Sequence, residues 1–458
     1  MSAAFEYGSP ALRRLPLING EPGRTLAWHD GRAISVGEFL ADVAATAALL
    51  PPGGDAINLC EDRYAFLVAF CAVASRARAN LLPPSRAPHA VDEALAAYPG
   101  SFTLGDRALA PSPRGFVRMP PLGTHGRLDE VPTLAADQVV AIGFTSGSTG
   151  LPKPNAKTWG AFHASNAQNV SALGALPGLE GDAIVHGVAT VPPQHMYGIE
   201  LSILLPLLGH CAMHSGRPLF PGDLAQALAD VPEPRLLVTT PVHLRALLRD
   251  PAPMPTLAGI TSATAPLSRE LAAEAEARYG APVLEFFGST ETCVIAQRRT
   301  ASESDWRLFA SVQLRPQPDG TQVDAPYFAQ PVVLQDVVEL LPGHAFRLCG
   351  RHADLVEIAG KRASLADLTR RVLALAGVED AVVLQLDESD SFGVQRIAAL
   401  VVAPSRDEAG LLRELREAID TAFLPRPLRK VDALPRNETG KLPRAALLAL
   451  LGAGRSGM

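Results

Sequence analysis

The chain has 458 residues, of which 47% are hydrophobic and 19% charged, a size that allows two or more domains with a large buried core. Its formal net charge is −6, so it lacks the basic field that nucleic acids and anionic lipids attract, and we expect no nucleic-acid partner and no membrane partner. The start of the chain carries no basic and apolar leader, and the longest apolar run, 199–208, is shorter than the roughly 20 residues of a membrane-spanning helix, so we expect a cytoplasmic protein.

Strand-like and helix-like segments alternate along the chain, which indicates a mixed α/β architecture. Residues 139–144 are typical of a buried strand, and a helix-compatible segment follows at 157–170. A strand is expected at 235–240, a helix ended by a glycine at 268–279, and another strand at 283–287. The strands at 139–144 and 283–287 each run into a polar, glycine-containing loop, which is where α/β sheets tend to bind ligands.

The last hundred residues resemble a separate α+β unit. Strands are expected at 381–386 and 397–402, an amphipathic helix at 409–423, and a final helix from about residue 443. We place the boundary between the two domains at residues 350 and 351.

The cysteines and histidines do not form a metal-binding or disulfide pattern. Five cysteines are scattered without a C-x-x-C pair, and the eleven histidines show no H-x-x-x-H spacing. This favours reduced thiols over a disulfide framework and argues against a transition-metal enzyme.

The most informative segment is 144–153, FTSGSTGLPK. Its glycines allow the backbone to approach a ligand with N–H groups free to meet oxyanions, and its hydroxyls and lysine add donors and a positive charge. A short Ser/Gly run alone is more often a solvated turn, and the P-loop pattern G-x-x-x-x-G-K-[ST] is absent. The candidate phosphate-binding residues are Thr145, Ser146, Gly147, Ser148, Thr149, Gly150 and Lys153.

The whole ten-residue string and four further stretches, in the same order, resemble the adenylate-forming superfamily. That superfamily includes the acyl- and aryl-CoA synthetases, the adenylation domains of peptide synthetases and firefly luciferase. The resemblance extends from about residue 139 to the C-terminus, whereas the first 130 residues carry no recognisable motif. The four stretches are VPPQHMYG at 191–198, FGSTE at 287–291, Asp336 ahead of Gly350-Arg351, and PRNETGK at 435–441.

The resemblance implies an enzyme that uses ATP and Mg²⁺ to activate a carboxylic acid as an acyl-adenylate. Two anions must approach each other in this reaction, so positive charge is needed around the phosphates. In the family, the glutamate at Glu291 binds Mg²⁺, Thr290 bonds to the α-phosphate, and Lys441 bridges the attacking carboxylate and the phosphoryl end of ATP. With Lys153, these are the catalytic candidates. Taken alone, Glu291 would be a surface carboxylate and Lys441 a solvated turn residue.

A further set of residues would bind the adenine base and the ribose of ATP. The resemblance places adenine on the ring of Phe287, where many relatives have tyrosine, and the ribose hydroxyls on Asp336, with Arg351 as a donor fork. Asp336 could otherwise be a structural aspartate. Ala263 and Thr264 stand where glycines are common in the family, which puts close contacts there in doubt. The adenine and ribose candidates are Phe287, Gly288, Ser262, Ala263, Thr264, Asp336 and Arg351.

The acid pocket and the hinge complete the candidate residues. His195, Tyr197 and Gly198 correspond to the acid-pocket segment, although His195 could instead be satisfied by nearby backbone in its proline-rich loop. The family's hinge pattern is G-R-x-[DK], and here Ala353 occupies the usual polar position, with Asp354 after it.

The expected fold class is α/β. A large multi-subdomain N-terminal domain, residues 1–350, would hold the ATP and acid sites. A small mobile α+β C-terminal lid, residues 351–458, would carry the catalytic Lys441 and turn between two poses for two half-reactions.

Three functions are compatible with these motifs. The favoured one is a stand-alone ligase that passes the acyl group to a thiol, either CoA or the phosphopantetheine of an acyl carrier protein acting in trans, since no carrier-attachment motif is present. The second transfers to an amine or dioxygen, and the third is a catalytically silent ATP-binding relative, which retention of Lys153, Glu291 and Lys441 argues against.

For the acid, the string PKPNAKTW at 152–159 resembles the small ligases of aryl polyene and xanthomonadin pigment biosynthesis, which load hydroxybenzoate-type acids onto a carrier protein. A fatty acyl-CoA ligase is the alternative.

Overall fold

The structure is a computed structural model that describes residues 13–83, 86–146, 152–181, 183–318, 320–351, 355–358, 361–389, 395–437 and 440–452. Contacts divide the chain into two compact units. Unit 1 extends to Ser304 and includes Pro326–Ala329, and unit 2 contains Asp305–Ala325 and the chain from Gln330 onward. None of the helices in these ranges is long and apolar enough to cross a membrane.

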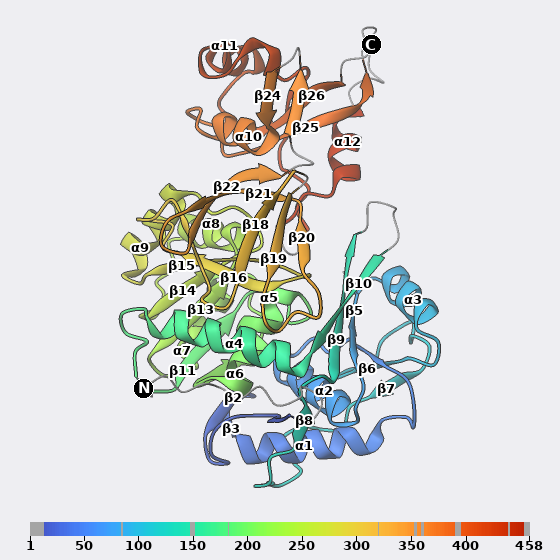
Figure 1. Ribbon diagram of the computed structural model, residues 1–458. Helices are drawn as coiled ribbons and strands as arrows, with labels where there is room; N and C mark the ends of the chain where they lie inside the picture. The colour runs from blue at the N-terminus through green and yellow to red at the C-terminus, as the bar shows by residue number, and fades with distance from the viewer. Residues whose placement is uncertain are drawn as a thin grey trace. The chain divides into compact units, whose positions relative to one another are not determined.

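Unit 1 contains a mainly parallel sheet that packs against a buried helix. Its strand order is β10-β9-β5-β4-β6-β7, and β10 alone runs antiparallel to its neighbour. Figure 1 labels five of these strands, β5, β6, β7, β9 and β10. Helix α2 (Arg63–Ser75) is buried from Arg63 to Ala74, which agrees with its apolar composition on all sides. The strands are β4 (Ala56–Asn58), β5 (Asn80–Leu82), β6 (Phe102–Gly105), β7 (Phe116–Arg118), β9 (Val139–Ser146) and β10 (Pro152–Thr158).

A second sheet in unit 1 has the order β16-β15-β14-β13-β11-β12-β2-β3, with antiparallel pairing only at β16 and β3. Helices α8 (Pro241–Arg249) and α9 (Arg269–Tyr279) connect consecutive parallel strands, as expected for this class of sheet. The strands are β2 (Thr25–His29), β3 (Arg32–Ser35), β11 (Val185–Ala189), β12 (Cys211–His214), β13 (Arg235–Thr239), β14 (Gly259–Ser262), β15 (Val283–Ser289) and β16 (Cys293–Arg298).

Three further helical segments of unit 1 lie near the motifs. Helix α4 (Trp159–Gly174) begins after the N-cap Thr158 and packs against β16 and against η2 (Glu200–Leu204), a π-helical turn that continues α5 (Met196–Ile199) (Figure 1). The helix expected at 157–170 starts two residues later because Lys157 and Thr158 still pair with β9. The helix expected at 268–279 is confirmed by α9, which has a serine N-cap and the left-handed Gly280 at its end.

Unit 2 combines small antiparallel sheets with an α+β C-terminal part. In the first part, β21 (Asp336–Leu341) pairs with β22 (Ala345–Arg351), which also pairs with β17 (Trp306–Leu308). A separate sheet contains β18 (Gln313–Gln317), β19 (Gly320–Asp324) and β20 (Val332–Leu334).

In the C-terminal part of unit 2, helices α10 and α11 share a core with the sheet β25-β26-β27. The elements are the hairpin β23 (Leu355–Ile358) and β24 (Lys361–Ser364), the strands β25 (Asp380–Ser389), β26 (Gln395–Val402) and β27 (Leu428–Lys430), and the helices α10 (Leu365–Leu373), α11 (Glu408–Ala418) and α12 (Arg444–Gly452).

The division into compact units falls at residue 304, earlier than the domain boundary expected at 350. The reason is local packing: β22 contacts α10 and β24, so the strands before residue 351 share contacts with the C-terminal part. The boundary at 350 and 351, as the place where the chain pivots, remains a prediction.

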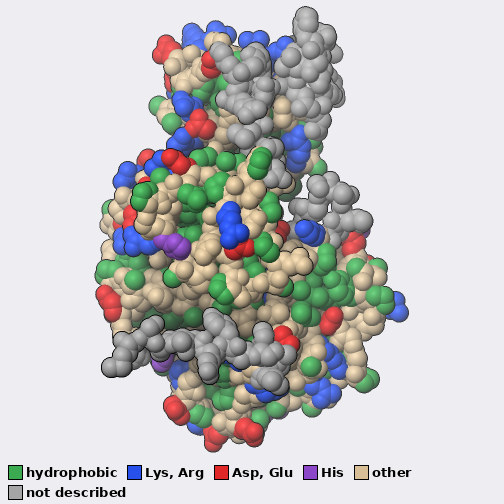
Figure 2. Space-filling model, in the orientation of Figure 1, with side chains coloured by type: hydrophobic (Ala, Val, Ile, Leu, Met, Phe, Trp, Pro, Cys, Tyr) green, Lys and Arg blue, Asp and Glu red, His purple; other side chains and the backbone are tan. Residues whose placement is uncertain are grey.

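The surface agrees with the composition. Figure 2 shows positive and negative side chains interspersed on the visible face of the described residues, which is the pattern expected from a modest net charge.

Candidate active site

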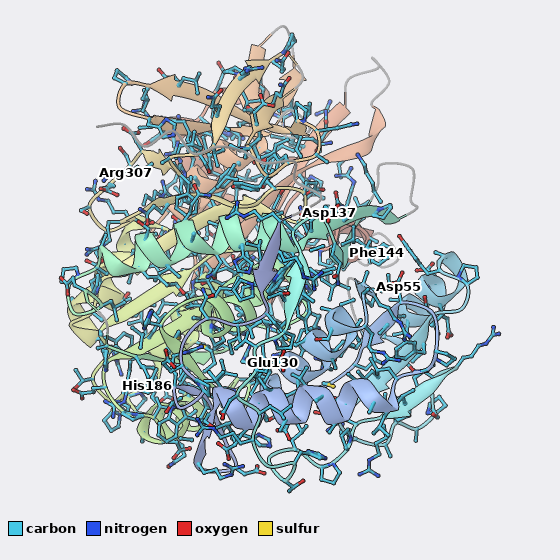
Figure 3. All side chains as sticks on the ribbon, turned by 60° about the horizontal axis from the view of Figure 1, so that its bottom comes forward. Asp55, Glu130, Asp137, Phe144, His186 and Arg307 are labelled. Carbon is cyan, nitrogen blue, oxygen red and sulfur yellow. The ribbon has the colours of Figure 1, made fainter. Side chains whose placement is uncertain are left out.

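The predicted phosphate loop is flanked by a regular hairpin. Strand β9 ends at Thr145 and Ser146, which pair with Lys153 and Pro152 at the start of β10, so the two ends of the loop are adjacent. Phe144, labelled in Figure 3, packs edge-on against Tyr98 at 5.8 Å between ring centroids. The central candidates, Gly147, Ser148, Thr149 and Gly150, lie outside the described residues.

The FGSTE motif forms the tight turn between β15 and β16. A Cβ on Gly288 would lie 2.2 Å from the carbonyl oxygen of Cys293, so only glycine fits there. Within the turn, the Ser289 N–H donates to the Thr292 hydroxyl at 3.2 Å, and the Thr292 N–H donates to the Ser289 hydroxyl at 3.2 Å. These bonds close the turn around Thr290 and Glu291, both of which are half-buried.

Three motif segments meet at Gly143 on β9. A Cβ added there would lie 2.6 Å from Cγ2 of Thr290 and 3.6 Å from Cε of Met196. The strand before the phosphate loop, the FGSTE turn and the acid-pocket segment are therefore in direct contact. Sequence reasoning missed Gly143, although a glycine inside an apolar strand is a signal of close approach.

The acid-pocket segment is a compact turn leading into α5. A Cβ on Gly198 would lie 2.0 Å from the carbonyl oxygen of Pro192, so glycine is required there too. The buried Tyr197 donates its hydroxyl to Thr261 on β14 at 2.9 Å, and burial raises the pKa of that hydroxyl. His195 is the half-buried N-cap residue of α5. Because Tyr197 is already bonded to β14, its side chain anchors this segment to the sheet.

Two of the predicted adenine-side residues, Ser262 and Thr264, lie where β14 ends. Ser262 is fully buried, and its hydroxyl oxygen has no hydrogen-bond partner among the described residues. Thr264 adopts φ of +79°, a left-handed conformation normally taken by glycine. A buried hydroxyl without a partner suits a polar ligand such as a nucleotide base.

Two buried charged residues beside the FGSTE turn escaped sequence reasoning. Lys157 on β10 is 6% exposed, and its Nζ donates to the backbone carbonyl of Glu291. Glu200, at the start of η2, is 1% exposed and accepts hydrogen bonds from Val294 and α4. One sign of this was visible in the sequence, because Glu200 is the one carboxylate in the longest apolar run, 199–208. A charged residue is almost never buried without a partner, so its place in that run indicates a specific role.

The ribose candidates lie in unit 2. Asp336 starts β21 and is the cross-strand partner of Arg351 on β22, so the structure brings these two predicted residues together. The backbone carbonyl of Asp336 also accepts a hydrogen bond from Thr321 at 2.6 Å. The hinge candidate Ala353 lies outside the described residues.

Lys441 also belongs to unit 2 and is exposed. Its N–H donates to the side chain of Asn437 at 2.8 Å, while the Asn437 N–H donates to the Lys441 carbonyl at 2.8 Å.

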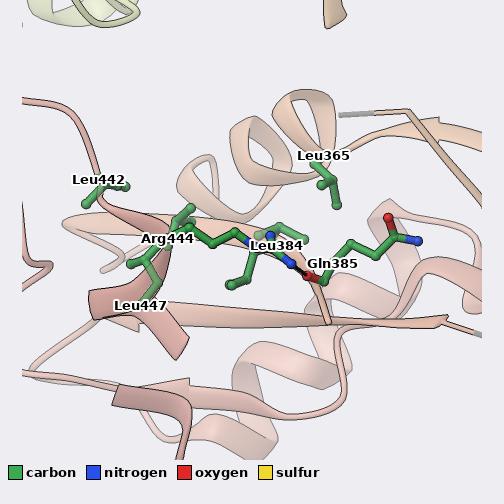
Figure 4. Close-up of a pocket in the computed structure, with 8 residues that line it drawn as sticks. Leu365, Leu384, Gln385, Leu442, Arg444 and Leu447 are labelled. Atoms are coloured by element: carbon green, nitrogen blue, oxygen red, sulfur yellow. Dashed lines mark hydrogen bonds between the residues drawn. The ribbon is translucent and has the colours of Figure 1, made fainter. Parts of the chain in front are cut away.

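Leu442, the residue after Lys441, is one of the residues that line a cavity of about 330 Å³ (Figure 4). None of the predicted site residues lines this cavity. It is lined by Leu365, Val382, Val383, Leu384, Gln385, Leu442, Arg444 and Leu447, and Arg444 donates to the Gln385 carbonyl at 2.7 Å.

Comparisons with known proteins agree with these motifs. Residues 19–324 match the model of a family described as AMP-binding enzyme. The chain is 28% identical to a 4-coumarate–CoA ligase from Halorhodospira halophila over 393 residues, or 79% of this chain and 92% of the other protein. It is 31% identical to a 4-coumarate–CoA ligase from Rhodobacter capsulatus over 303 residues, or 65% of this chain and 73% of the other protein.

A solved structure with a similar fold is o-succinylbenzoate CoA synthetase from Bacillus subtilis in complex with its acyl-adenylate intermediate. The TM-score is 0.78 at 18% identity, and the alignment covers 95% of this chain and 98% of that chain. This similarity confirms the expected fold class, α/β with a large N-terminal domain and a smaller C-terminal one.

Proposed function

This chain belongs to the AMP-binding enzyme family and is an AMP-forming acid–thiol ligase, and from that premise we propose that it activates a hydroxybenzoate-type aryl acid and loads it onto the phosphopantetheine of an acyl carrier protein acting in trans. CoA is the alternative thiol. The observation that supports the site most strongly is the contact of the strand before the phosphate loop, the FGSTE turn and the acid-pocket segment at Gly143.

The residue chemistry suits adenylation. Formation of the acyl-adenylate joins the acid to the α-phosphate of ATP and releases pyrophosphate, so negative charge must be neutralised as the two anions meet. Lys153 and the hydroxyls of residues 145–149 would hold the phosphates. Thr290 would donate to the α-phosphate, and Lys441 would bridge carboxylate and phosphate. A Mg²⁺ ion held by the Glu291 carboxylate would supply further positive charge.

The aryl substrate is supported by similarity and by pocket composition. Both 4-coumarate–CoA ligases are named for a hydroxylated aryl acid. In this chain, the predicted acid-pocket residues His195, Met196 and Tyr197 combine an imidazole, a thioether and a tyrosine ring, which suits a flat ring with a polar substituent better than a long aliphatic chain.

The test is ATP–pyrophosphate exchange over a panel of acids. We expect exchange with 3- or 4-hydroxybenzoate to exceed exchange with octanoate or acetate, because a site built to bond a hydroxyl is left with unpaired polar groups when that hydroxyl is missing. Benzoate is the matched control, since it differs from 4-hydroxybenzoate by the hydroxyl alone. Octanoate as the best substrate would contradict the aryl proposal and favour a fatty acyl ligase.

The acceptor is tested separately with the acid that exchanges best. We expect faster transfer to a phosphopantetheinylated carrier protein than to free CoA. Faster transfer to CoA would contradict the carrier proposal. Exchange without transfer to either thiol would point to an amine or dioxygen acceptor, and no exchange with any acid would favour a silent ATP-binding relative.

A further inference from the structure

We propose that Glu200 is a positioning residue which, together with Lys157, holds the turn that carries Thr290 and Glu291 in its reactive geometry. This inference rests on the proposed adenylation function, because it assigns a role in placing two of its predicted catalytic groups. Neither Glu200 nor Lys157 is among the catalytic or binding candidates that the resemblance implies, although Lys157 lies within the string PKPNAKTW at 152–159.

Lys157 holds the first end of the turn. It lies on β10, only 6% exposed, and its Nζ donates to the backbone carbonyl of Glu291 across 134 residues of sequence. A lysine that is nearly buried loses most of its hydration, so it needs strong acceptors inside the protein. Here its acceptor is the backbone of a predicted metal ligand.

Glu200 holds the other end. Both of its carboxylate oxygens accept from the backbone N–H of Val294, at 2.9 and 3.2 Å. Two side chains of α4, one turn apart, orient the carboxylate: Ser165 donates its hydroxyl at 2.5 Å and Asn169 its amide at 3.2 Å. The segment from Glu291 to Val294 is therefore bonded at one end to a buried ammonium group and at the other to a buried carboxylate.

The turn needs support from outside because its own geometry is strained. Cys293 adopts φ of +62°, a left-handed conformation that is uncommon for a residue other than glycine and asparagine. Local bonds between Ser289 and Thr292 close the turn, but they do not involve Thr290 or Glu291 through their side chains. The bonds from Lys157 and Glu200 fix the backbone on both sides of the strained residue.

Burying these charges is costly, which argues against a purely packing role. Burial raises the pKa of the Glu200 carboxyl to about 7, although the bonds from Ser165, Asn169 and Val294 and the charge of Lys157 act in the opposite direction. A well-packed apolar residue at either position would avoid this cost. The helix also widens to a π-helical turn that starts at Glu200, and such turns are frequent at functional sites.

The consequence for the reaction is geometric. Thr290 and Glu291 must meet the α-phosphate and the metal within a few tenths of an ångström, and a misplacement of about 1 Å can cost roughly a hundredfold in rate. Removing either support should therefore lower the rate of the adenylation step while leaving the acid pocket's affinity intact.

The experiment compares Glu200→Gln, Lys157→Met and the double variant with the wild-type enzyme in ATP–pyrophosphate exchange. In Glu200→Gln one of the two acceptor oxygens becomes an NH2 donor. Either the Val294 N–H or the donors of α4, Ser165 and Asn169, then lose an acceptor. We expect kcat to fall about tenfold to a hundredfold, with the KM for the acid unchanged within about twofold. The double variant should lose no more than about the worse single variant, because both act on one turn.

The matched control is Asp42→Asn. Asp42 is also fully buried and accepts from a backbone N–H, that of Gly123 at 2.8 and 3.0 Å, and from the hydroxyl of Tyr64 at 2.6 Å, but its partners include no predicted site residue. We expect this variant to lower thermal stability as much as Glu200→Gln does while retaining kcat. Ser165→Ala, which removes one bond to Glu200, provides a milder variant that keeps the fold.

The inference is overturned if Glu200→Gln and Ser165→Ala retain the wild-type kcat, if Asp42→Asn loses kcat to the same extent, or if the loss appears in the KM for the acid. Should the wild-type enzyme exchange with no acid, the proposed function fails on its own. In that case calorimetric titration with Mg²⁺ and ATP decides the role of Glu200. Binding about tenfold weaker in Glu200→Gln, but not in Asp42→Asn, supports the positioning role. Binding equal to that of the wild-type protein in Glu200→Gln rejects it.

Discussion

At the scale of single residues, the predicted catalytic Lys441 lies in a loop that is held by residues of its own motif. The preceding Gly440 has φ of +80°. The Lys441 N–H donates to the side chain of Asn437, and the Asn437 N–H donates to the Lys441 carbonyl, so the loop is closed within the motif itself. The side chain is exposed in unit 2, which suits a group that meets its substrate in one of two poses.

At this scale we expect Lys441→Ala to cost about 3–4 kcal/mol in the adenylation transition state, or about 10²–10³ in the rate of pyrophosphate exchange. Thioester formation from synthetic acyl-adenylate should be nearly unchanged, because the proposed rotation has by then moved Lys441 away. Lys430→Ala is the control, since it removes a positive charge from the same unit at a residue that bonds to the backbone carbonyl of Arg406. Equal damage to both half-reactions would contradict the role of Lys441.

At the scale of elements, the β15–β16 turn determines how the predicted catalytic groups are presented. The pairing of the two strands shifts by one residue between Phe287 and Gly288, and the bulge brings the backbone of Gly288 against Cys293 and Val294. Glycine at this position is therefore a requirement of the hairpin, whatever further role it has at adenine.

Gly288→Ala should destabilise the protein by about 1–3 kcal/mol, because its Cβ has no space and the bulge must deform. Pyrophosphate exchange should fall as well, since Thr290 and Glu291 move with the turn. Gly222→Ala in α7 (Pro221–Ala229) is the control: no atom lies within 4 Å of its added Cβ, so stability should change by less than about 1 kcal/mol. Denaturant titration measures both variants, and equal midpoints would show that the turn tolerates a side chain.

At the scale of the whole molecule, the division of the predicted residues between two units matters most. Thr290, Glu291 and Lys153 belong to unit 1, whereas Asp336 and Lys441 belong to unit 2. The predicted two-pose mechanism requires the C-terminal lid to bring Lys441 to the site for adenylation and to turn to a second pose for transfer of the acyl group.

The hinge prediction tests this directly. Proline fixes φ near −65° and removes a backbone donor, so Ala353→Pro should prevent rotation. Pyrophosphate exchange should persist while overall ligation to the thiol collapses, and Ala353→Gly, which restricts nothing, should retain both activities. If Ala353→Pro keeps full ligation, the pivot lies elsewhere or the enzyme needs no rotation.

The sequence by itself determined the features that depend on short, contiguous stretches. Strands β9, β13 and β15 were expected from apolar runs, and α9 from its serine cap and terminal glycine, because such signals act within a few residues. The motif strings were enough to identify the superfamily, since the chemistry of phosphate binding imposes residue types at fixed local spacing.

Only the tertiary structure revealed the contacts that join distant segments. Gly143 against Thr290, Lys157 bonded to Glu291 and Glu200 bonded to Val294 link residues about a hundred or more positions apart, and no local pattern specifies such partners. The division into compact units at residue 304 was likewise visible only in the tertiary structure, because it follows from the packing of β22 on α10 and β24. Burial and hydrogen-bond partners depend on which surfaces the fold brings together. The apolar run around Glu200 marked that residue as unusual, but no local pattern specified its partners or those of Lys157.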